Sequence, residues 1–96
     1  MFILRTTNAE PQQIFRVPPG TERTIGRATG ADFIVTAPLV SRVHCRVGVG
    51  EAGTLLVADL GSTNGTFVNG QRVDKASLLP GDRLMVGRIE LVVEKG

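Results

Sequence analysis

Short apolar runs with a period of two residues constrain the fold of this chain more than any other feature. In residues 43–49, Val43, Cys45 and two further valines fall on one predicted face, and His44 falls on the other. Residues 89–93 alternate in the same way. This period is typical of β-strands that bury one face, and no stretch repeats convincingly at the helical spacing. The chain is therefore expected to consist of strands.

Turn-forming residues separate these runs at close intervals. The turn signals are Pro18-Pro19-Gly20, Gly30-Ala31-Asp32, Gly50 to Gly53, Asn64-Gly65, Asn69-Gly70 and Pro80-Gly81-Asp82. Strands between them are expected at 14–17, 24–26, 33–35, 55–60 and 84–86. Many short strands joined by frequent turns are typical of an all-β antiparallel sandwich or barrel. Because no linker or repeat is present, residues 1–96 are predicted to form one domain.

The charge composition argues against binding to nucleic acids or membranes. The eleven basic and nine acidic residues leave a formal net charge of +2, and the chain has no Trp or Tyr for stacking on bases. No apolar run approaches the length of a membrane span. Nine of the basic residues are arginines, whose planar guanidinium groups suit phosphate or carboxylate, although an arginine-rich genome produces the same bias.

Cysteine usage and the N-terminus favour a cytoplasmic module. The single cysteine, Cys45, has no partner for an intrachain disulfide and cannot build a cysteine-based metal site. His44 and Cys45 are expected to point to opposite faces of a strand, so no metal ion is expected between them. The apolar residues 1–4 run directly into Arg5 and are too short for a signal peptide.

Residues 59–70 are richer in hydrogen-bonding groups than a hairpin requires. Asn69-Gly70 is explained by turn chemistry, because Asn-Gly supplies the positive φ angles of a two-residue type I′ turn. Turn chemistry does not explain why a Ser-Thr-Asn cluster stands at 62–64. A glycine-containing loop crowded with short donors and acceptors is suited to hold a polar ligand.

Three loops carry polar residues that can converge on one site. Arg27 begins one loop, Ser41 and Arg42 close the next, and the cluster at 62–64 forms the third. A sandwich gathers alternate loops at one end. A phosphate dianion needs a permanent cation, hydroxyl donors and N–H groups, because charge-assisted hydrogen bonds are about twice as strong as neutral ones. The two arginines, Ser41 and Thr63 can supply the cations and hydroxyls.

The order and spacing of these residues resemble the signature of forkhead-associated (FHA) domains. The matching segments are Gly26-Arg27, Ser41-x-x-His44, Ser62-x-Asn64-Gly65-Thr66, Asn69-Gly70 and Leu79 to Leu84 followed by Gly87. The resemblance runs from about residue 14 to residue 93. It implies a β-sandwich of about eleven short strands that recognises phosphothreonine in a partner protein, such as a Ser/Thr kinase substrate, through loops at one end. No cofactor is expected.

Carried over by position, the resemblance assigns roles to individual residues. The phosphate-binding residues would be Arg27, Ser41, Arg42 and Thr63, and the residue bound to the peptide backbone would be Asn64. The residues that shape the loops would be Gly26, His44, Ser62, Gly65 and Asn69. Simpler roles stay open at two of these positions: solvent exposure for Arg42 and a turn-capping hydroxyl for Ser41.

The resemblance also leads to predictions of ligand selectivity. The loop before the signature serine, residues 37–40, contains no Arg or Lys. We therefore predict no strong preference for Asp three residues after the phosphothreonine, unless Arg72 or another distant basic residue reaches over, and a tilt toward aliphatic residues packed against Leu39 or Val40. A small apolar niche beside Gly65 is predicted to favour phosphothreonine over phosphoserine, which lacks one methyl group.

Two other functions can be built on the same residues. Ser41, His44 and Asp59 could act as nucleophile, base and orienter. Ser41 stands on no Gly-x-Ser-x-Gly elbow, and nothing suggests an oxyanion hole, so an enzyme is not expected. A phosphate-independent interaction scaffold of the same fold is the serious alternative.

Overall fold

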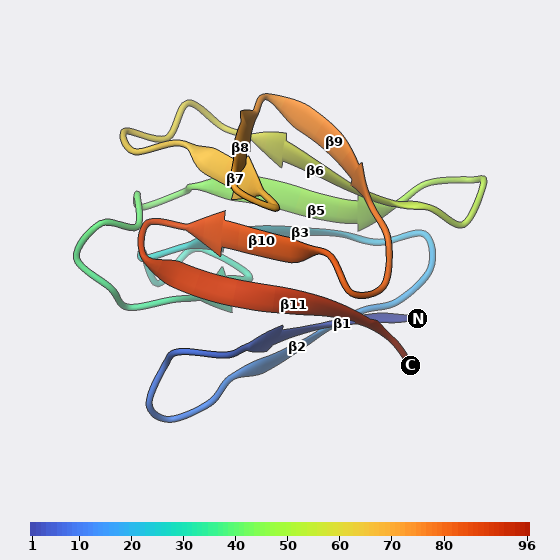
Figure 1. Ribbon diagram of the computed structural model, residues 1–96, viewed down its shortest axis with the longest axis horizontal. Coiled ribbons are helices and arrows are strands. Elements are labelled where there is room, and N and C mark those ends of the chain that lie inside the picture. Colours follow the sequence, from blue (N-terminus) through green and yellow to red (C-terminus); the bar gives the residue numbers. More distant parts are fainter.

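The computed structural model describes residues 1–96 as two β-sheets packed face to face (Figure 1). The six-stranded sheet has the order β2-β1-β11-β10-β7-β8, and all its neighbouring pairs are antiparallel. Its strands are β1 (Phe2–Thr6), β2 (Ile14–Val17), β7 (Thr66–Val68), β8 (Gln71–Val73), β10 (Arg83–Val86) and β11 (Ile89–Lys95). Because β1 pairs with β11, the two chain ends lie side by side.

The five-stranded sheet has the order β4-β3-β5-β6-β9. Its strands are β3 (Glu22–Gly26), β4 (Phe33–Ile34), β5 (Cys45–Val49), β6 (Leu55–Asp59) and β9 (Lys75–Leu78). The antiparallel sandwich is confirmed except at β3 and β4, which pair in parallel. The loop between them returns to Thr24, whose N–H and hydroxyl donate to the Asp32 carboxylate at 2.9 and 3.2 Å. The chain therefore enters β4 in the direction of β3.

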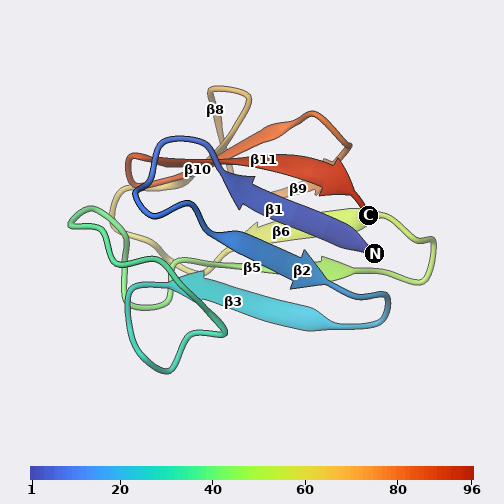
Figure 2. The same cartoon turned by 90° about the horizontal axis from the view of Figure 1, so that it is seen from below.

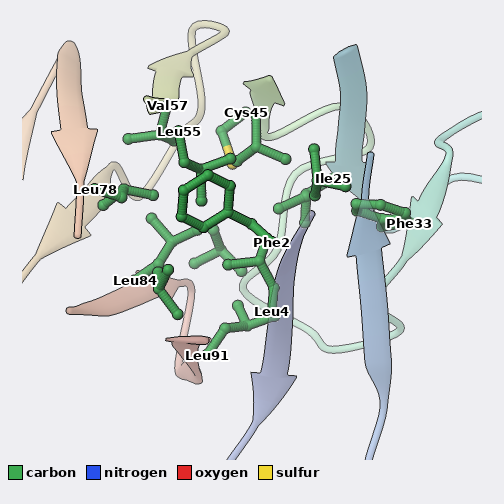
Figure 3. Packing of buried hydrophobic residues seen from close by; sticks show 14 of the residues in the cluster. Phe2, Leu4, Ile25, Phe33, Cys45, Leu55, Val57, Leu78, Leu84 and Leu91 are labelled. Atoms are coloured by element: carbon green, nitrogen blue, oxygen red, sulfur yellow. The ribbon is translucent and has the colours of Figure 1, made fainter. Parts of the chain in front are cut away.

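Sixteen buried apolar residues from both sheets form one core (Figure 3). Figure 3 shows the ring of Phe2 between Leu84 of the six-stranded sheet and Leu55 of the five-stranded sheet. Fully burying one such side chain stabilises a fold by about 1.5–3 kcal/mol. Cys45 belongs to this core, and burial followed by the nearby charge of Asp59 raises its pKa to about 12. Its thiol is therefore neutral at physiological pH.

Most of the predicted strands are confirmed. Those at 14–17, 33–35, 55–60 and 84–86 appear as β2, β4, β6 and β10 within one residue at each end, and β3 begins two residues before the predicted 24–26. The prediction of a strand at 43–49 is wrong at its first two residues. β5 begins at Cys45, Val43 is 44% exposed, and His44 is fully buried. His44 is buried because both ring nitrogens have hydrogen-bond partners in neighbouring loops.

The loops gather at the two ends of the sandwich. In Figure 1 the loops that follow β3, precede β5 and follow β6 lie together on the left, and both chain termini lie on the right. Figure 2 shows the same separation after a turn of 90°. The predicted site loops therefore share one end of the molecule.

The structure contains no helix that is long and apolar enough to cross a membrane.

Candidate functional site

The first site loop is held close to the second because β3 ends in a glycine. A Cβ atom on Gly26 would lie 2.0 Å from the backbone oxygen of Arg42. The close approach lets the Arg27 N–H donate to the Ser41 carbonyl oxygen at 2.9 Å. The Ala28 N–H donates to the Arg42 carbonyl oxygen at 3.1 Å. The backbones of the two loops are thus bonded to each other, and a side chain at position 26 would separate them.

The second loop is anchored at its middle. Val40 is 1% exposed and belongs to the core, whereas Leu39 is 38% exposed. Gly87, in the turn between β10 and β11, has a φ of +60°, and a Cβ atom there would lie 2.9 Å from the carbonyl carbon of Leu39. Of the two residues offered for packing against an aliphatic ligand residue, Val40 is excluded, because core packing removes its side chain from the surface. Leu39 is the aliphatic residue that stays accessible.

The ring of His44 connects the second and third loops from inside. Its Nδ1 accepts the backbone N–H of Ser41 at 3.1 Å, and its Nε2 lies 2.8 Å from the carbonyl oxygen of Gly65. A backbone N–H only donates and a carbonyl oxygen only accepts, so this arrangement requires a neutral ring with its proton on Nε2. Both ring nitrogens are therefore occupied within the protein.

The carboxylate of Asp59 organises the third loop. It accepts the N–H groups of Gly61 and Ser62 at 3.1 and 3.2 Å, and the hydroxyls of Ser62 and Thr66. Partial burial raises the pKa of Asp59, but the hydrogen bonds from Ser62 and Thr66 outweigh burial and hold the pKa below its ordinary value of 3.8. The Ser62 hydroxyl oxygen also accepts the Gly65 N–H at 2.9 Å. The loop is fixed by its own side chains.

Arg27 and Arg42 lie on the outer side of these loops. Arg27 is exposed, and its Nε donates to the carbonyl oxygen of Val40 at 3.0 Å. This bond orients the guanidinium and leaves the N–H groups of Nη1 and Nη2 free. The side chain of Arg42 is exposed and forms neither a hydrogen bond nor an ion pair, so it is available to a ligand but not positioned by the protein.

The hydroxyl groups of the site come from two adjacent loops. The Ser41 hydroxyl oxygen accepts the backbone N–H of Thr63 at 3.1 Å, which leaves the hydroxyl hydrogen free to donate. Thr63 is exposed, and its own hydroxyl has no partner. The Asn64 Nδ2 donates to the Leu39 carbonyl oxygen at 3.0 Å, so its Oδ1 and one amide hydrogen remain free. Ser41, Thr63 and Asn64 thus lie together at the loop end.

One predicted site residue lies away from the others. Asn69 and Gly70 have φ angles of +50° and +84°, which confirms the predicted type I′ turn between β7 and β8. The Asn69 side chain donates to the Asp82 carboxylate at 3.1 Å and accepts the Arg83 N–H at 2.9 Å. It joins β7 to the start of β10, at the end of β7 opposite the site loops.

The residues considered for a hydrolase do not form a hydrogen-bonded triad. The His44 Nδ1 accepts the backbone N–H of Ser41, not the hydroxyl, and the other ring nitrogen faces a carbonyl oxygen. Both oxygens of Asp59 are engaged within its own loop. No ring nitrogen is free to take a proton from Ser41.

A groove of about 420 Å³ lies on the outer face of the five-stranded sheet, away from these loops. The half-exposed Leu56 and the small residues Gly48 and Ala58 line it, with Lys75 at one side. It contains none of the predicted site residues. Loop donors can bind a phosphate without a deep cavity, because they need only a cluster of N–H and O–H groups. A groove elsewhere on the molecule is therefore compatible with a binding site on the loops.

A model of the FHA domain matches residues 23–87, which include β3 from its second residue, β4 to β10 and all three site loops. The chain belongs to the FHA domain family. The match begins just before Gly26-Arg27 and ends at Gly87, so it contains every motif of the resemblance.

Curated FHA relatives include two mycobacterial proteins. The ABC transporter ATP-binding/permease protein Rv1747 of Mycobacterium tuberculosis is 45% identical over 80 residues, which are 83% of this chain and 9% of that protein. The glycogen accumulation regulator GarA of Mycolicibacterium smegmatis is 39% identical over 74% of this chain and 44% of that protein. The chain spans less than half the length of either relative.

Solved FHA structures superpose over nearly the whole chain. One comes from a study of phosphothreonine-dependent FHA domain interactions and has a TM-score of 0.89 at 30% identity, covering 99% of this chain and 96% of that one. The FhaA FHA domain, complexed with the intracellular domain of Rv3910, has a TM-score of 0.88 at 31% identity, covering 98% and 100% of the two chains. The eleven-stranded FHA sandwich implied by the sequence is therefore confirmed.

Sequence reasoning missed the contributions of Asp59 and Thr66. It weighed Asp59 only as part of a hydrolase, whereas its carboxylate binds four donors of the third loop. The spacing Asp59-Leu60-Gly61-Ser62 is that of an Asp side chain bonding the backbone two residues ahead, and it could have been recognised as an Asx turn. The Thr66 contact had no signal of this kind, because it depends on how the loop folds back.

Proposed function

We propose that this FHA domain binds phosphothreonine in a partner protein through the loops at one end of its sandwich. One observation carries the proposal. Arg27, Ser41 and Thr63 present unpaired donors from loops that are bonded to one another. Free donors on a preorganised surface lower the ordering cost of binding. An incoming dianion would therefore meet a cation and two hydroxyls at one end of the molecule.

Arg27 and Ser41 would be the main phosphate ligands. The Nη groups of Arg27 would form charge-assisted hydrogen bonds with phosphate oxygens, and the Ser41 hydroxyl would donate a third. Arg42 and Thr63 would assist from the rim. Asp59 is the nearest carboxylate on the third loop, but both its oxygens are already bonded within that loop. It would therefore not compete for these donors.

Asn64 would hold the peptide backbone beside the phosphothreonine. Its Nδ2 contact with the Leu39 carbonyl fixes the amide, and the free Oδ1 would accept a peptide N–H. Gly26, His44, Ser62 and Gly65 would keep the loops in this arrangement. The Asn64-Gly65 turn is the proposed wall of the niche for the threonine methyl group, because a glycine permits close approach.

The partner would be a protein that a Ser/Thr kinase has phosphorylated on threonine. The domain would bind neither nucleic acid nor a membrane, and it would need no cofactor. Kinases use ATP, so we propose that the module acts in the cytoplasm. We also propose that residues 1–96 form a single FHA domain with no catalytic activity. A relative that is a kinase, Rad53 of Saccharomyces cerevisiae, aligns with this chain over only 11% of its length.

The test begins with an oriented phosphothreonine peptide library, from which one binding sequence is chosen. Titration calorimetry then compares that peptide with its unphosphorylated and phosphoserine forms at fixed salt. We expect binding of the phosphothreonine peptide, no measurable binding of the unphosphorylated one, and binding of phosphoserine weakened by about tenfold or more, the value of a filled methyl niche. Phosphoserine binding within threefold would contradict the niche.

The phosphate-independent scaffold predicts a different result. A natural partner would bind equally well before and after phosphatase treatment. The groove over Leu56 and Ala58 would be the surface to test in that case. Loss of binding after phosphatase treatment would exclude this alternative.

A further inference from the structure

Arg72 of β8 lies against the third site loop, although the sequence motifs place it outside the site. A Cβ atom on Gly65 would lie 2.8 Å from Nε of Arg72, 3.1 Å from its Cζ and 3.3 Å from its Cδ. The guanidinium and the end of its stem therefore cover the Cα of Gly65. A cation thus stands next to Asn64, the residue proposed to hold the peptide.

The strand register explains this position. Phe67 of β7 pairs with Arg72 of β8, so the two side chains share one face of the hairpin. Gly65 precedes Phe67 by two residues and faces the same side, but it carries no side chain. The long stem of Arg72 occupies the space that a side chain at position 65 would fill.

The charge of Arg72 is not neutralised within the protein. Arg5, Arg46 and Arg83 each have a carboxylate oxygen within 4 Å, in Glu94, Glu22 and Glu90 respectively. Arg72 is exposed and forms no ion pair and no side-chain hydrogen bond. All five of its N–H donors are therefore available to a ligand.

Arg72 contacts the third loop at a different residue from the one that contacts Ser41. Thr63 is the residue of this loop that contacts Ser41, whereas Gly65 is the residue that contacts Arg72. Asn64 lies between them and reaches Leu39 on the second loop. Arg72 thus meets the loop two residues after Thr63, where it can hold an anionic group of the ligand other than the phosphate.

We propose that Arg72 binds an acidic side chain of the same peptide, at one fixed position beside the phosphothreonine. The proposal rests on the proposed phosphothreonine function. A guanidinium pairs with a carboxylate through two parallel hydrogen bonds, which gives positional preference as well as attraction. The loop at 37–40 contains no basic residue. The preference for an acidic residue would therefore come from the β7–β8 hairpin and not from that loop.

The experiment uses the phosphothreonine peptide that the library selects, rebuilt with neutral flanking residues. A peptide series carries Glu at one position at a time, from three residues before the phosphothreonine to four after it. Each peptide is titrated into the wild-type domain, Arg72→Gln, Arg72→Lys and Arg16→Gln. Arg16 is the matched control, since it is exposed and unpaired on β2, at the opposite edge of the same sheet.

We expect one Glu position to raise wild-type affinity by about threefold to fivefold, the range of an exposed ion pair. Arg72→Gln should abolish this gain, Arg72→Lys should retain part of it, and Arg16→Gln should retain all of it. The neutral parent peptide should bind Arg72→Gln and wild type within twofold. The gain should also decrease at high salt, because exposed charge pairs are screened.

The failures of the two proposals are distinguishable. If the neutral phosphothreonine peptide binds but no Glu position raises affinity, the role of Arg72 is wrong and phosphothreonine binding stands. A gain in affinity from Glu that survives in Arg72→Gln would likewise show that the role of Arg72 is wrong. If no phosphothreonine peptide binds at all, the proposed function is wrong and the proposal for Arg72 is wrong with it.

Discussion

The loop end of this sandwich contains an inner and an outer group of polar residues, which differ in how their hydrogen bonds are satisfied. The inner group is His44, Asp59, Ser62 and Thr66, and the outer group is Arg27, Arg42, Thr63 and Asn64. The inner residues bond to one another and to loop backbone, and no buried side-chain polar atom in the structure lacks a partner. The outer residues are exposed and keep unpaired donors.

This difference separates stability from binding within one short sequence signature. Satisfying buried polar groups avoids the cost of about 1–3 kcal/mol that each unpaired group would carry. The outer donors are solvated in the free protein, so leaving them unpaired costs little. Changes to the inner group, or to Gly26 where the first two loops meet, should reduce both stability and affinity. Changes to the outer group should reduce affinity alone.

The largest effect is expected for Gly26→Ala. Its Cβ atom would overlap the backbone oxygen of Arg42, and neither backbone can move without breaking the bonds between their loops. We expect the free energy of unfolding to fall by about 3 kcal/mol or more and phosphopeptide binding to be lost. Denaturant unfolding measures the first and calorimetry the second. Gly30→Ala is the control, because a Cβ atom there meets nothing within 4 Å; equal stability of the two variants would refute this explanation.

His44→Ala should have the next largest effect. It removes a fully buried ring and leaves the Ser41 N–H and the Gly65 carbonyl without their partners. We expect a loss of about 2–4 kcal/mol in the free energy of unfolding, together with weaker binding. Denaturant unfolding of His44→Ala checks this. Arg42→Ala is the control and should unfold like wild type. An unchanged stability would remove His44 from the inner group.

Arg27→Ala should weaken binding while stability changes little. The loss of a charge-assisted contact is worth roughly 1.5–3 kcal/mol, so phosphothreonine affinity should fall by about tenfold or more. Calorimetry and thermal unfolding of the same samples separate the two effects, and Arg16→Ala controls for the change in charge. Normal binding by folded Arg27→Ala would show that the phosphate site is wrongly assigned.

The smallest effect concerns pH. The pKa of Asp59 is lower in the folded protein than its ordinary value of 3.8, so its stabilisation is present above that pH and is lost as the pH falls through the folded pKa. Asp59→Asn should be less stable than wild type by about 1 kcal/mol at neutral pH. The stability difference between the two should stay constant above pH 3.8 and narrow below it. A difference that widens on acidification would have the wrong sign for this account.

Sequence analysis predicted the sandwich because strand periodicity and turn signals are local. It placed β2, β6 and β10 within one residue at each end, but it did not resolve β7, β8 or β9, which are only three or four residues long. It also misplaced Val43 and His44, because the burial of a histidine ring depends on partners in loops distant in sequence. The sequence offered Arg72 only as a distant basic residue, and its place beside Gly65 could not be derived because it arises from the pairing of β7 with β8.

The central claim is that the ligand binds the outer group and the Ser41 hydroxyl at the loop end, and amide chemical shifts test it most directly. The measurement is an ¹H–¹⁵N spectrum of the domain titrated with the selected phosphothreonine peptide and, separately, with its unphosphorylated form. The account predicts that the largest shifts occur in the amides of residues 27–28, 41–42 and 62–65, and only with the phosphorylated peptide. Shifts concentrated around Leu56 and Lys75 in the groove, or identical shifts with both peptides, would contradict it.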